Sequence, residues 1–229
     1  MRGLLVTATD TGVGKTVLSA ALLAAMAAGG ESVCAHKPVV TGLGEESEIG
    51  QLSGWPADHE LLGRVAGMTP EQVAPLRYGP AVSPHLAARL AGEQIDPAQL
   101  LAAARSAAAG ESTLIVEGVG GLLAPLAEDY TVRDLAVALE LPLLIAARPG
   151  LGTINHTLLT LQAARAAGLD VLAVVLTPWP QKPNEIERSN RETIARLGEI
   201  EVATLGHVRS PNVADLARAG DELPWRRWL

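Results

Sequence analysis

A lysine–threonine pair, Lys15-Thr16, follows a short glycine-containing segment near the start of the chain. The segment LLVTATDTGVGKT consists of an apolar run, a loop with Gly12 and Gly14, and the start of an alanine- and leucine-rich stretch. This order is typical of a phosphate-binding loop, in which backbone N–H groups and a helix N-terminus surround an anion. Lys15 would then reach the β- and γ-phosphates, and the Thr16 hydroxyl would bind Mg²⁺. The sequence therefore predicts a nucleoside triphosphate site, although Thr9 stands where the general motif has its first glycine.

Glu117 ends a second apolar run and is followed by the glycine-rich segment GVGG. Mg²⁺ binds hard oxygen ligands in near-octahedral geometry, so Thr16 needs carboxylate partners. In an open α/β sheet, ligands bind at the carboxyl ends of the strands. Glu117 is therefore a candidate metal ligand, and the alternative is that it only caps the following turn.

The elements that must position these residues alternate along the chain between short strand-like runs and longer helical stretches. Such alternation is typical of βαβ units that share a parallel sheet. We expect strands at 4–7, 33–37, 113–117, 143–147, 171–177 and 202–208. We expect helices at 15–28, 84–91, 97–109, 132–139, 154–167 and 185–197. The predicted fold is α/β: a single P-loop NTPase domain over residues 1–229, with a mostly parallel central sheet and helices on both faces.

Composition narrows the class of partner. The formal net charge is -7 over 229 residues, which opposes a nucleic-acid-binding face because phosphate backbones are held by clustered Lys and Arg. No run of about 18 uncharged apolar residues occurs, and the apolar N-terminal run is too short for a signal peptide, so we expect no membrane span. Cys34 is the only cysteine, which fits a reducing compartment. We expect a cytoplasmic protein with a small-molecule partner.

Four motifs resemble those of the dethiobiotin synthetase family, and the resemblance covers nearly the whole chain. The loop ATDTGVGKT, residues 8–16, is similar to the family's GTDTxVGKT, with Ala8 in place of the first glycine. The segment KPVVTG, residues 37–42, resembles K-P-V-x-[ST]-G. The segment DHELL, residues 58–62, is similar to D-x-x-x-L, and GLGTINH, residues 150–156, resembles the family's G-x-x-N-H turn at a helix start.

The resemblance implies an ATP- and Mg²⁺-dependent ligase of biotin biosynthesis that works as a homodimer. Its substrates would be 7,8-diaminononanoate, CO₂ or bicarbonate, and ATP or another nucleoside triphosphate. One amine would form a carbamate that attacks the γ-phosphate, giving a carbamic–phosphoric anhydride. The second amine would then close the ureido ring and expel phosphate. No side-chain nucleophile is required.

The resemblance also implies roles for individual residues. The implied catalytic residues are Lys37, Lys15 and Thr11. The implied nucleotide-binding residues are Gly12, Val13, Gly14, Lys15, Thr16, Val17, Glu117, Gly118, Gly120, Thr177 and Pro178. Thr41 and the helix start Gly152, Thr153, Ile154 and Asn155 would bind the diamine, the latter from the neighbouring subunit. The implied metal ligands are Thr16, Asp58 and Glu117.

Some assignments keep an alternative. The glycine-rich stretch 43–56 reads as a mobile functional loop, and Glu45, Glu46 or Glu48 could replace Asp58 as the metal ligand. Thr177 to Trp179 stand where some family members have an asparagine that reads adenine, and Trp179 could stack on a base or lie at an interface.

Two other functional classes fit the phosphate loop less well. A ParA/MinD-like switch that organises DNA or membrane has a lysine at the position of Asp10, and we find no basic or amphipathic surface. The ATP-using half of a corrin-ring amide synthetase is usually joined to a glutamine-hydrolysing domain, for which this chain is too short.

Overall fold

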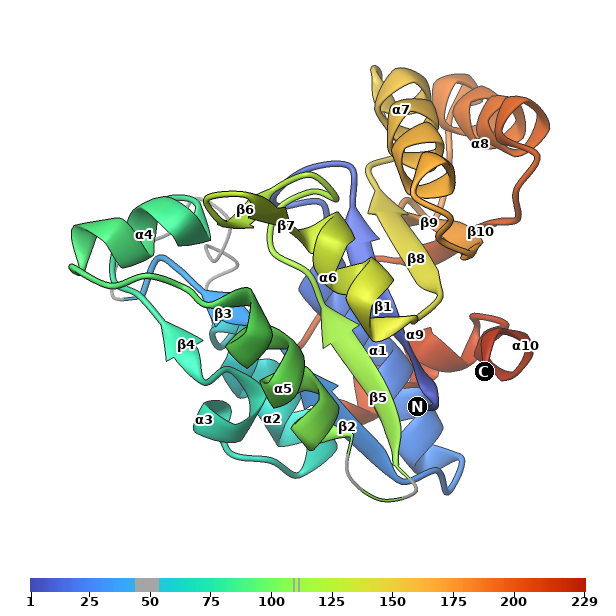
Figure 1. Ribbon diagram of the computed structural model, residues 1–229. Helices are drawn as coiled ribbons and strands as arrows, with labels where there is room; N and C mark the ends of the chain where they lie inside the picture. Colours follow the sequence, from blue (N-terminus) through green and yellow to red (C-terminus); the bar gives the residue numbers. More distant parts are fainter. Residues whose placement is uncertain (44–53, 109, 111) are drawn as a thin grey trace.

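Six parallel strands form the central sheet in the order β10-β9-β8-β1-β5-β2 (Figure 1). The computed structural model describes residues 1–43, 54–108, 110 and 112–229. The strands are β1 (Gly3–Ala8), β2 (Val33–His36), β5 (Thr113–Glu117), β8 (Leu143–Ala147), β9 (Val171–Trp179) and β10 (Val202–Gly206). Every pairing within this sheet is parallel, which confirms the predicted α/β class.

β1 lies in the middle of the sheet, and all six of its residues are buried. Strands of a parallel sheet are covered on both faces, so they read as continuous apolar runs. Leu4 and Val6 pack into the core on one face, and Leu5 packs into the core on the other. The carboxyl end of β1 is therefore held firmly where the phosphate loop begins.

One face of the sheet is covered by α1 (Lys15–Ala28), α2 (Asp58–Ala66), α3 (Pro70–Val73), α9 (Val213–Asp221) and α10 (Trp225–Trp228). α1 and α9 pack closely because both present small residues: a Cβ built on Gly220 would lie 2.0 Å from the Ala21 carbonyl oxygen. Trp225 and Trp228 are buried in the same core, so the C-terminal tail docks on the molecule.

The other face carries α4 (Pro84–Leu90), α5 (Pro97–Ala107), α6 (Val132–Leu139), α7 (Thr153–Ala166) and α8 (Glu185–Gly198) (Figure 1). Two small sheets complete the structure. β3 (Val39–Val40) pairs with β4 (Leu76–Arg77), and β6 (Pro125–Ala127) pairs with β7 (Tyr130–Thr131).

The predicted elements differ from the observed ones mainly at their ends. The strand expected at 33–37 ends at His36, and the strand expected at 171–177 continues to Trp179. The helix expected at 154–167 is Thr153–Ala166. α2, α3, α9, α10 and the four short strands were not predicted. Most of the expected loop 43–56, with Glu45, Glu46 and Glu48, lies outside the described residues, as does Ala109.

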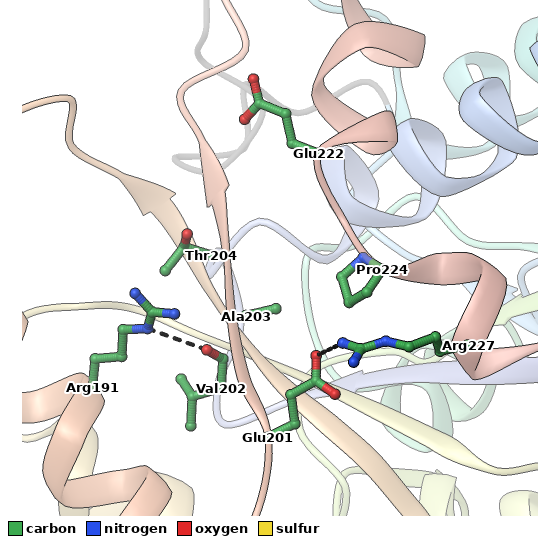
Figure 2. A pocket seen from close by; sticks show the side chains of 8 residues that line it. All are labelled: Arg191, Glu201, Val202, Ala203, Thr204, Glu222, Pro224 and Arg227. Carbon is green, nitrogen blue, oxygen red and sulfur yellow. Dashed lines mark hydrogen bonds and ion pairs between the residues drawn. The ribbon is translucent and has the colours of Figure 1, made fainter.

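β10 forms one edge of the sheet, and a hollow of about 500 Å³ lies beside it (Figure 2). Arg227 Nη2 donates to Glu201 Oε1 at 2.9 Å, and Arg191 Nε donates to the Val202 carbonyl at 3.2 Å (Figure 2). Covering an edge carbonyl in this way protects the strand from pairing with another chain. No residue predicted for the functional site lines this hollow. Among the described helices, none combines the length and apolar character needed to span a bilayer.

Candidate functional site

The phosphate loop joins the end of β1 to the start of α1. Thr9 N donates to the Ala146 carbonyl of β8 at 3.0 Å, which fixes the first part of the loop. α1 begins at Lys15, and its N-cap is Gly14, which makes no side-chain capping bond. The Lys15 ammonium turns back over the loop and donates to the Asp10 carbonyl at 3.1 Å. The helix N-terminus and the Lys15 ammonium thus lie at one place, as an anion site requires.

Two glycines of the loop have backbone conformations that favour glycine. Gly12 has φ 69° and Gly14 has φ 99°. Gly14 is also crowded, because a Cβ there would lie 3.1 Å from the Thr177 Cγ2 atom. Thr177, a predicted nucleotide-binding residue, therefore packs directly against the phosphate loop. Ala8, which replaces the family's first glycine, belongs to β1, and its methyl group lies in the core.

A charged cluster links the ends of three elements at this edge of the sheet. The Lys37 ammonium lies 2.5 Å from Asp58 Oδ2 and 2.5 Å from Glu117 Oε1. The Thr16 hydroxyl donates to the same Glu117 oxygen at 2.9 Å. Lys37 directly follows β2, Asp58 begins α2, and Glu117 ends β5. Four predicted site residues that are up to 101 positions apart in the sequence are thus brought into contact.

Burial and the two acids set the charge of the lysines. Burial alone would lower the pKa of Lys37, but Asp58 and Glu117 outweigh this effect and raise it above its ordinary value. Burial, and then repulsion by Lys37, lowers the pKa of Lys15 to about 8. Burial would raise the pKa of Asp58, but the Lys37 ammonium holds it below its usual value. Lys15 and Lys37 thus carry positive charge near pH 7, and Asp58 and Glu117 offset part of it within the cluster.

The donor set fits a hard divalent cation. Glu117 is completely buried, and its Oε2 atom has no hydrogen-bond partner among the described residues. A buried carboxylate oxygen without a partner is costly, so a cation at this point would stabilise it. Within the part of the chain that the structure describes, no group of three or more His, Cys, Asp or Glu could hold a metal alone. A Mg²⁺ ion here would therefore bind Thr16, Asp58 and Glu117 together with phosphate oxygens.

The glycine-rich segment after β5 packs beside the phosphate loop. Gly118 N donates to the Val6 carbonyl at 2.9 Å. A Cβ on Gly120 would lie 3.6 Å from Thr11 Oγ1, and one on Gly121 would lie 3.3 Å from the Ala8 carbonyl. Thr11 is exposed at this junction, and Val13 is buried. The glycine-rich segment thus packs closely against the phosphate loop at the ligand edge.

Other predicted residues lie at the margin of this cluster. The Val17 side chain is half-buried and packs against the α1 core, and Pro178 is exposed after a cis peptide bond. Trp179 packs against the core below α7 and α8. Thr41 is half-buried just after β3. His36 is buried, and burial lowers its pKa to about 4, so it is neutral near pH 7.

The start of α7 is open to a ligand. Its N-cap is Gly152, with φ 90° and no side-chain capping bond. Thr153 Oγ1 lies 3.4 Å from Thr157 Oγ1, and Asn155 is exposed, so neither side chain caps the helix. Among the described residues, no side chain accepts from the first N–H groups of α7, although Thr153 N donates to the Gly150 carbonyl at 3.3 Å. Among the described residues, no hydrogen bond joins this helix start or Thr41 to the Lys37 cluster.

One residue beside the loop was missed from the sequence. Arg148 follows β8, and its Nη2 atom donates to the carbonyl oxygens of Thr11 and Gly12. A cation at the carboxyl end of a predicted strand is a partial signal, but the sequence does not reveal that this strand, β8, pairs with β1. The sequence motifs do not include this position, because the residue acts on the loop from a different strand.

Known proteins match this chain over most of its length. A family profile described as an AAA domain matches residues 2–219. The "ATP-dependent dethiobiotin synthetase BioD" of Anaeromyxobacter sp. (strain K) is 42% identical over 208 residues, covering 86% of this chain and 90% of the relative. The protein of that name from Mycobacterium sp. (strain KMS) is 39% identical, covering 100% of this chain and 98% of the relative.

Solved structures are similar in fold. The cell division ATPase MinD of Pyrococcus furiosus superposes with a TM-score of 0.56 and 16% identity, covering 97% of this chain and 98% of that chain. At this identity the likeness concerns the fold alone. The curated relatives are far more similar in sequence and span nearly the whole chain. This chain belongs to the dethiobiotin synthetase family.

Proposed function

We propose that this chain is an ATP-dependent dethiobiotin synthetase, a Mg²⁺-dependent ligase that closes a ureido ring on 7,8-diaminononanoate with CO₂. The observation that carries the proposal is the contact between Lys37, Glu117 and Thr16. It joins a lysine that could hold an anionic acceptor to the residues that could hold a metal–nucleotide complex. A phosphoryl transfer to an anion needs both at one place.

Lys37 and Lys15 would prepare the reaction by offsetting charge. A carbamate formed from one substrate amine is an anion, and it must approach a polyanionic triphosphate. The Lys37 ammonium would hold the carbamate, with Thr11 and Thr41 nearby, while Lys15 would hold the β- and γ-phosphates. The carbamate oxygen would then attack the γ-phosphorus, and ADP would leave. The second amine would attack the carbamoyl carbon of the resulting anhydride, and phosphate would leave as the ring closes.

Thr16, Asp58 and Glu117 would hold the metal ion. When bound, Mg²⁺ supplies positive charge to the phosphate oxygens and offsets the charge that builds up on the leaving group. The Lys37 ammonium lies against both carboxylates. Asp58 and Glu117 would thus keep the Lys37 ammonium in place to hold the substrate, as well as bind the metal ion.

The α7 start would bind the substrate carboxylate of a second copy of the chain. Free N–H groups at a helix N-terminus and the positive end of its dipole favour an anion. The uncapped start at Gly152 and the exposed Asn155 support this assignment. A homodimer with two composite sites follows from it.

The function is tested by following ADP and dethiobiotin formation from ATP and Mg²⁺. We expect turnover only when both the diamine and bicarbonate are present, with one ADP formed for each dethiobiotin. Omission of either substrate is the internal control. ATP hydrolysis that proceeds without diamine and rises with DNA or lipid vesicles would instead support a MinD-like switch, in which case the synthetase proposal is wrong.

A further inference from the structure

Arg148 reaches from the end of β8 to the outside of the phosphate loop. Its Nη2 atom donates to the Thr11 carbonyl at 3.3 Å and to the Gly12 carbonyl at 3.3 Å. β8 is the strand that pairs with β1, so the arginine starts beside the strand from which the loop emerges. One guanidinium group therefore contacts two successive peptide groups of the loop.

These two contacts fix the direction of two backbone N–H groups. The Thr11 carbonyl shares a peptide plane with the Gly12 N–H, and the Gly12 carbonyl shares one with the Val13 N–H. In a trans peptide the carbonyl and the N–H point in opposite directions, and the cis bond of the described chain is Thr177–Pro178. The Gly12 and Val13 N–H groups therefore point away from Arg148. Neither donates to another described residue, so both are available to a ligand.

The loop needs such a restraint because of its glycines. Gly12 has φ 69° and Gly14 has φ 99°. Glycine has more backbone freedom than any other residue, so a loop with two glycines is flexible unless other contacts hold it. A loop that must be ordered when the ligand arrives loses affinity to the entropy of ordering. A loop that is already held in the binding conformation does not.

The arginine itself is held at its base and carries an unbalanced charge. The buried Asn190 side chain of α8 donates to the Pro149 carbonyl at 2.9 Å and to the Gly150 carbonyl at 3.0 Å. These bonds fix the turn that follows Arg148. Within residues 1–43, 54–108, 110 and 112–229, no carboxylate lies within ion-pair distance of its guanidinium. The guanidinium therefore carries a positive charge that no described carboxylate offsets, on the outer side of the phosphate loop.

We propose that Arg148 is a positioning residue for the nucleotide, which orients the Gly12 and Val13 N–H groups toward the phosphates before ATP binds. The inference rests on the proposed function only in that the bound anion is a nucleoside triphosphate. Arg148 acts through the loop backbone, so it governs nucleotide affinity and leaves the chemical step nearly unchanged.

The test compares Arg148→Met with the wild-type chain. Methionine keeps much of the apolar stem and removes both donors and the charge. By calorimetric titration with ATP and Mg²⁺ in the absence of diamine, we expect the Kd to rise about five- to tenfold, the scale of the net contribution of one ordinary hydrogen bond. In steady-state assays the KM for ATP should rise by the same factor, while kcat changes by less than about twofold.

Two further variants separate positioning from other effects. Arg148→Lys keeps a donor and the charge but not the guanidinium geometry, so its Kd should lie between those of the wild type and Arg148→Met. Arg105→Met is the matched control, because Arg105 is also exposed and donates to a backbone carbonyl, that of Ala138, at 3.1 Å on other elements. It should bind ATP like the wild type. The thermal midpoints of all three variants should match, since each residue is at the surface.

Three outcomes overturn the proposal. An Arg148→Met chain that binds ATP like the wild type shows that the contacts do not matter. A fall in kcat without a change in KM shows that Arg148 acts on the reacting groups. If the ratio of the Arg148→Met Kd to the wild-type Kd falls to one at about 0.5 M KCl, only the long-range charge of Arg148 matters. Because ATP binding is measured without diamine, a wild-type chain that binds ATP but makes no dethiobiotin contradicts the proposed function alone.

Discussion

The Lys37 ammonium lies between Asp58, at the start of α2, and Glu117, at the end of β5. We expect Lys37→Ala to lower kcat by about a hundredfold or more, the scale found when a pre-placed electrostatic group is removed. ATP should still bind, because Lys15 and the loop are unchanged. Dethiobiotin formation at saturating substrates measures the first quantity, and calorimetric titration with ATP measures the second.

Lys182→Ala is the control for this variant, because Lys182 is the exposed lysine between β9 and α8. It should turn over like the wild type. Removing Lys37 also leaves the buried Glu117 without its cation, which destabilises the chain. Thermal unfolding with and without Mg²⁺ therefore accompanies the assay, and a folded Lys37→Ala chain with wild-type kcat would contradict the assigned role.

Glu117 tests the metal assignment. Glu117→Gln keeps an oxygen that can accept from Thr16 and removes the negative charge that a cation needs. We expect the Mg²⁺ concentration for half-maximal activity to rise about tenfold or more, as when a ligand of a metal site is altered. Glu201→Gln, which alters an exposed ion pair with Arg227, is the control. An unchanged Mg²⁺ titration for Glu117→Gln means that this carboxylate does not bind the metal.

The sequence predicted the positions of several site residues along the chain, but it did not predict the contacts between their side chains. Lys15, Thr16 and Glu117 could be placed because each stands at a strand end or helix start that its local pattern reveals. The direct contact of Lys37 with Glu117 and Asp58 could not be derived, because it depends on the register of β2 and β5 and on how α2 approaches them. Arg148 was missed because its partners are backbone carbonyls, which carry no sequence signal.

At the scale of elements, α1 positions Lys15 and Thr16, and α9 supports α1 from outside. The contact depends on Gly220, where a Cβ would lie 2.0 Å from the Ala21 carbonyl oxygen and 2.9 Å from Ala25 Cβ. Gly220→Ala must therefore push the two helices apart. We expect it to lower the free energy of unfolding by about 1–3 kcal/mol, the usual cost of overpacking. Chemical denaturation followed by circular dichroism gives the value.

Gly206→Ala provides the comparison, since a Cβ at Gly206 meets no atom within 4 Å and its φ is not in the left-handed region. It should change stability by less than about 0.5 kcal/mol. Equal stability of the two variants would mean that α9 moves freely over α1. α9 was not predicted although its apolar side chains lie on one face, because it spans only nine residues and contains Gly220, and glycine counts against a helix.

At the scale of the whole molecule, the α/β class could be predicted because six apolar runs alternate with helical stretches, and this pattern allows few architectures. The order of the strands could not be read from the chain, because β5 lies between β1 and β2 although it follows β2 by many residues. Whether two copies share a site also depends on surfaces beyond one chain. The uncapped α7 start gives a way to test it.

Asn155→Asp places a negative charge in the exposed first turn of α7. An acid at this position favours the helix, so folding should not suffer. It should repel a substrate carboxylate and raise the KM for the diamine about tenfold, while the Kd for ATP stays unchanged. Steady-state assays at varied diamine measure the first quantity. Lys37→Ala disables the other part of the site, so the two variants can be combined.

A heterodimer of one Lys37→Ala chain and one Asn155→Asp chain, purified through two different tags, separates the two possible arrangements. If each site uses Lys37 of one chain and the α7 start of the other, one site carries both changes and the second carries neither. Such a heterodimer should show about half of the wild-type activity at low diamine, although each parent is nearly inactive there. If each chain forms its own site, both sites are damaged and no activity returns. A single-chain mass in solution would likewise contradict the shared site.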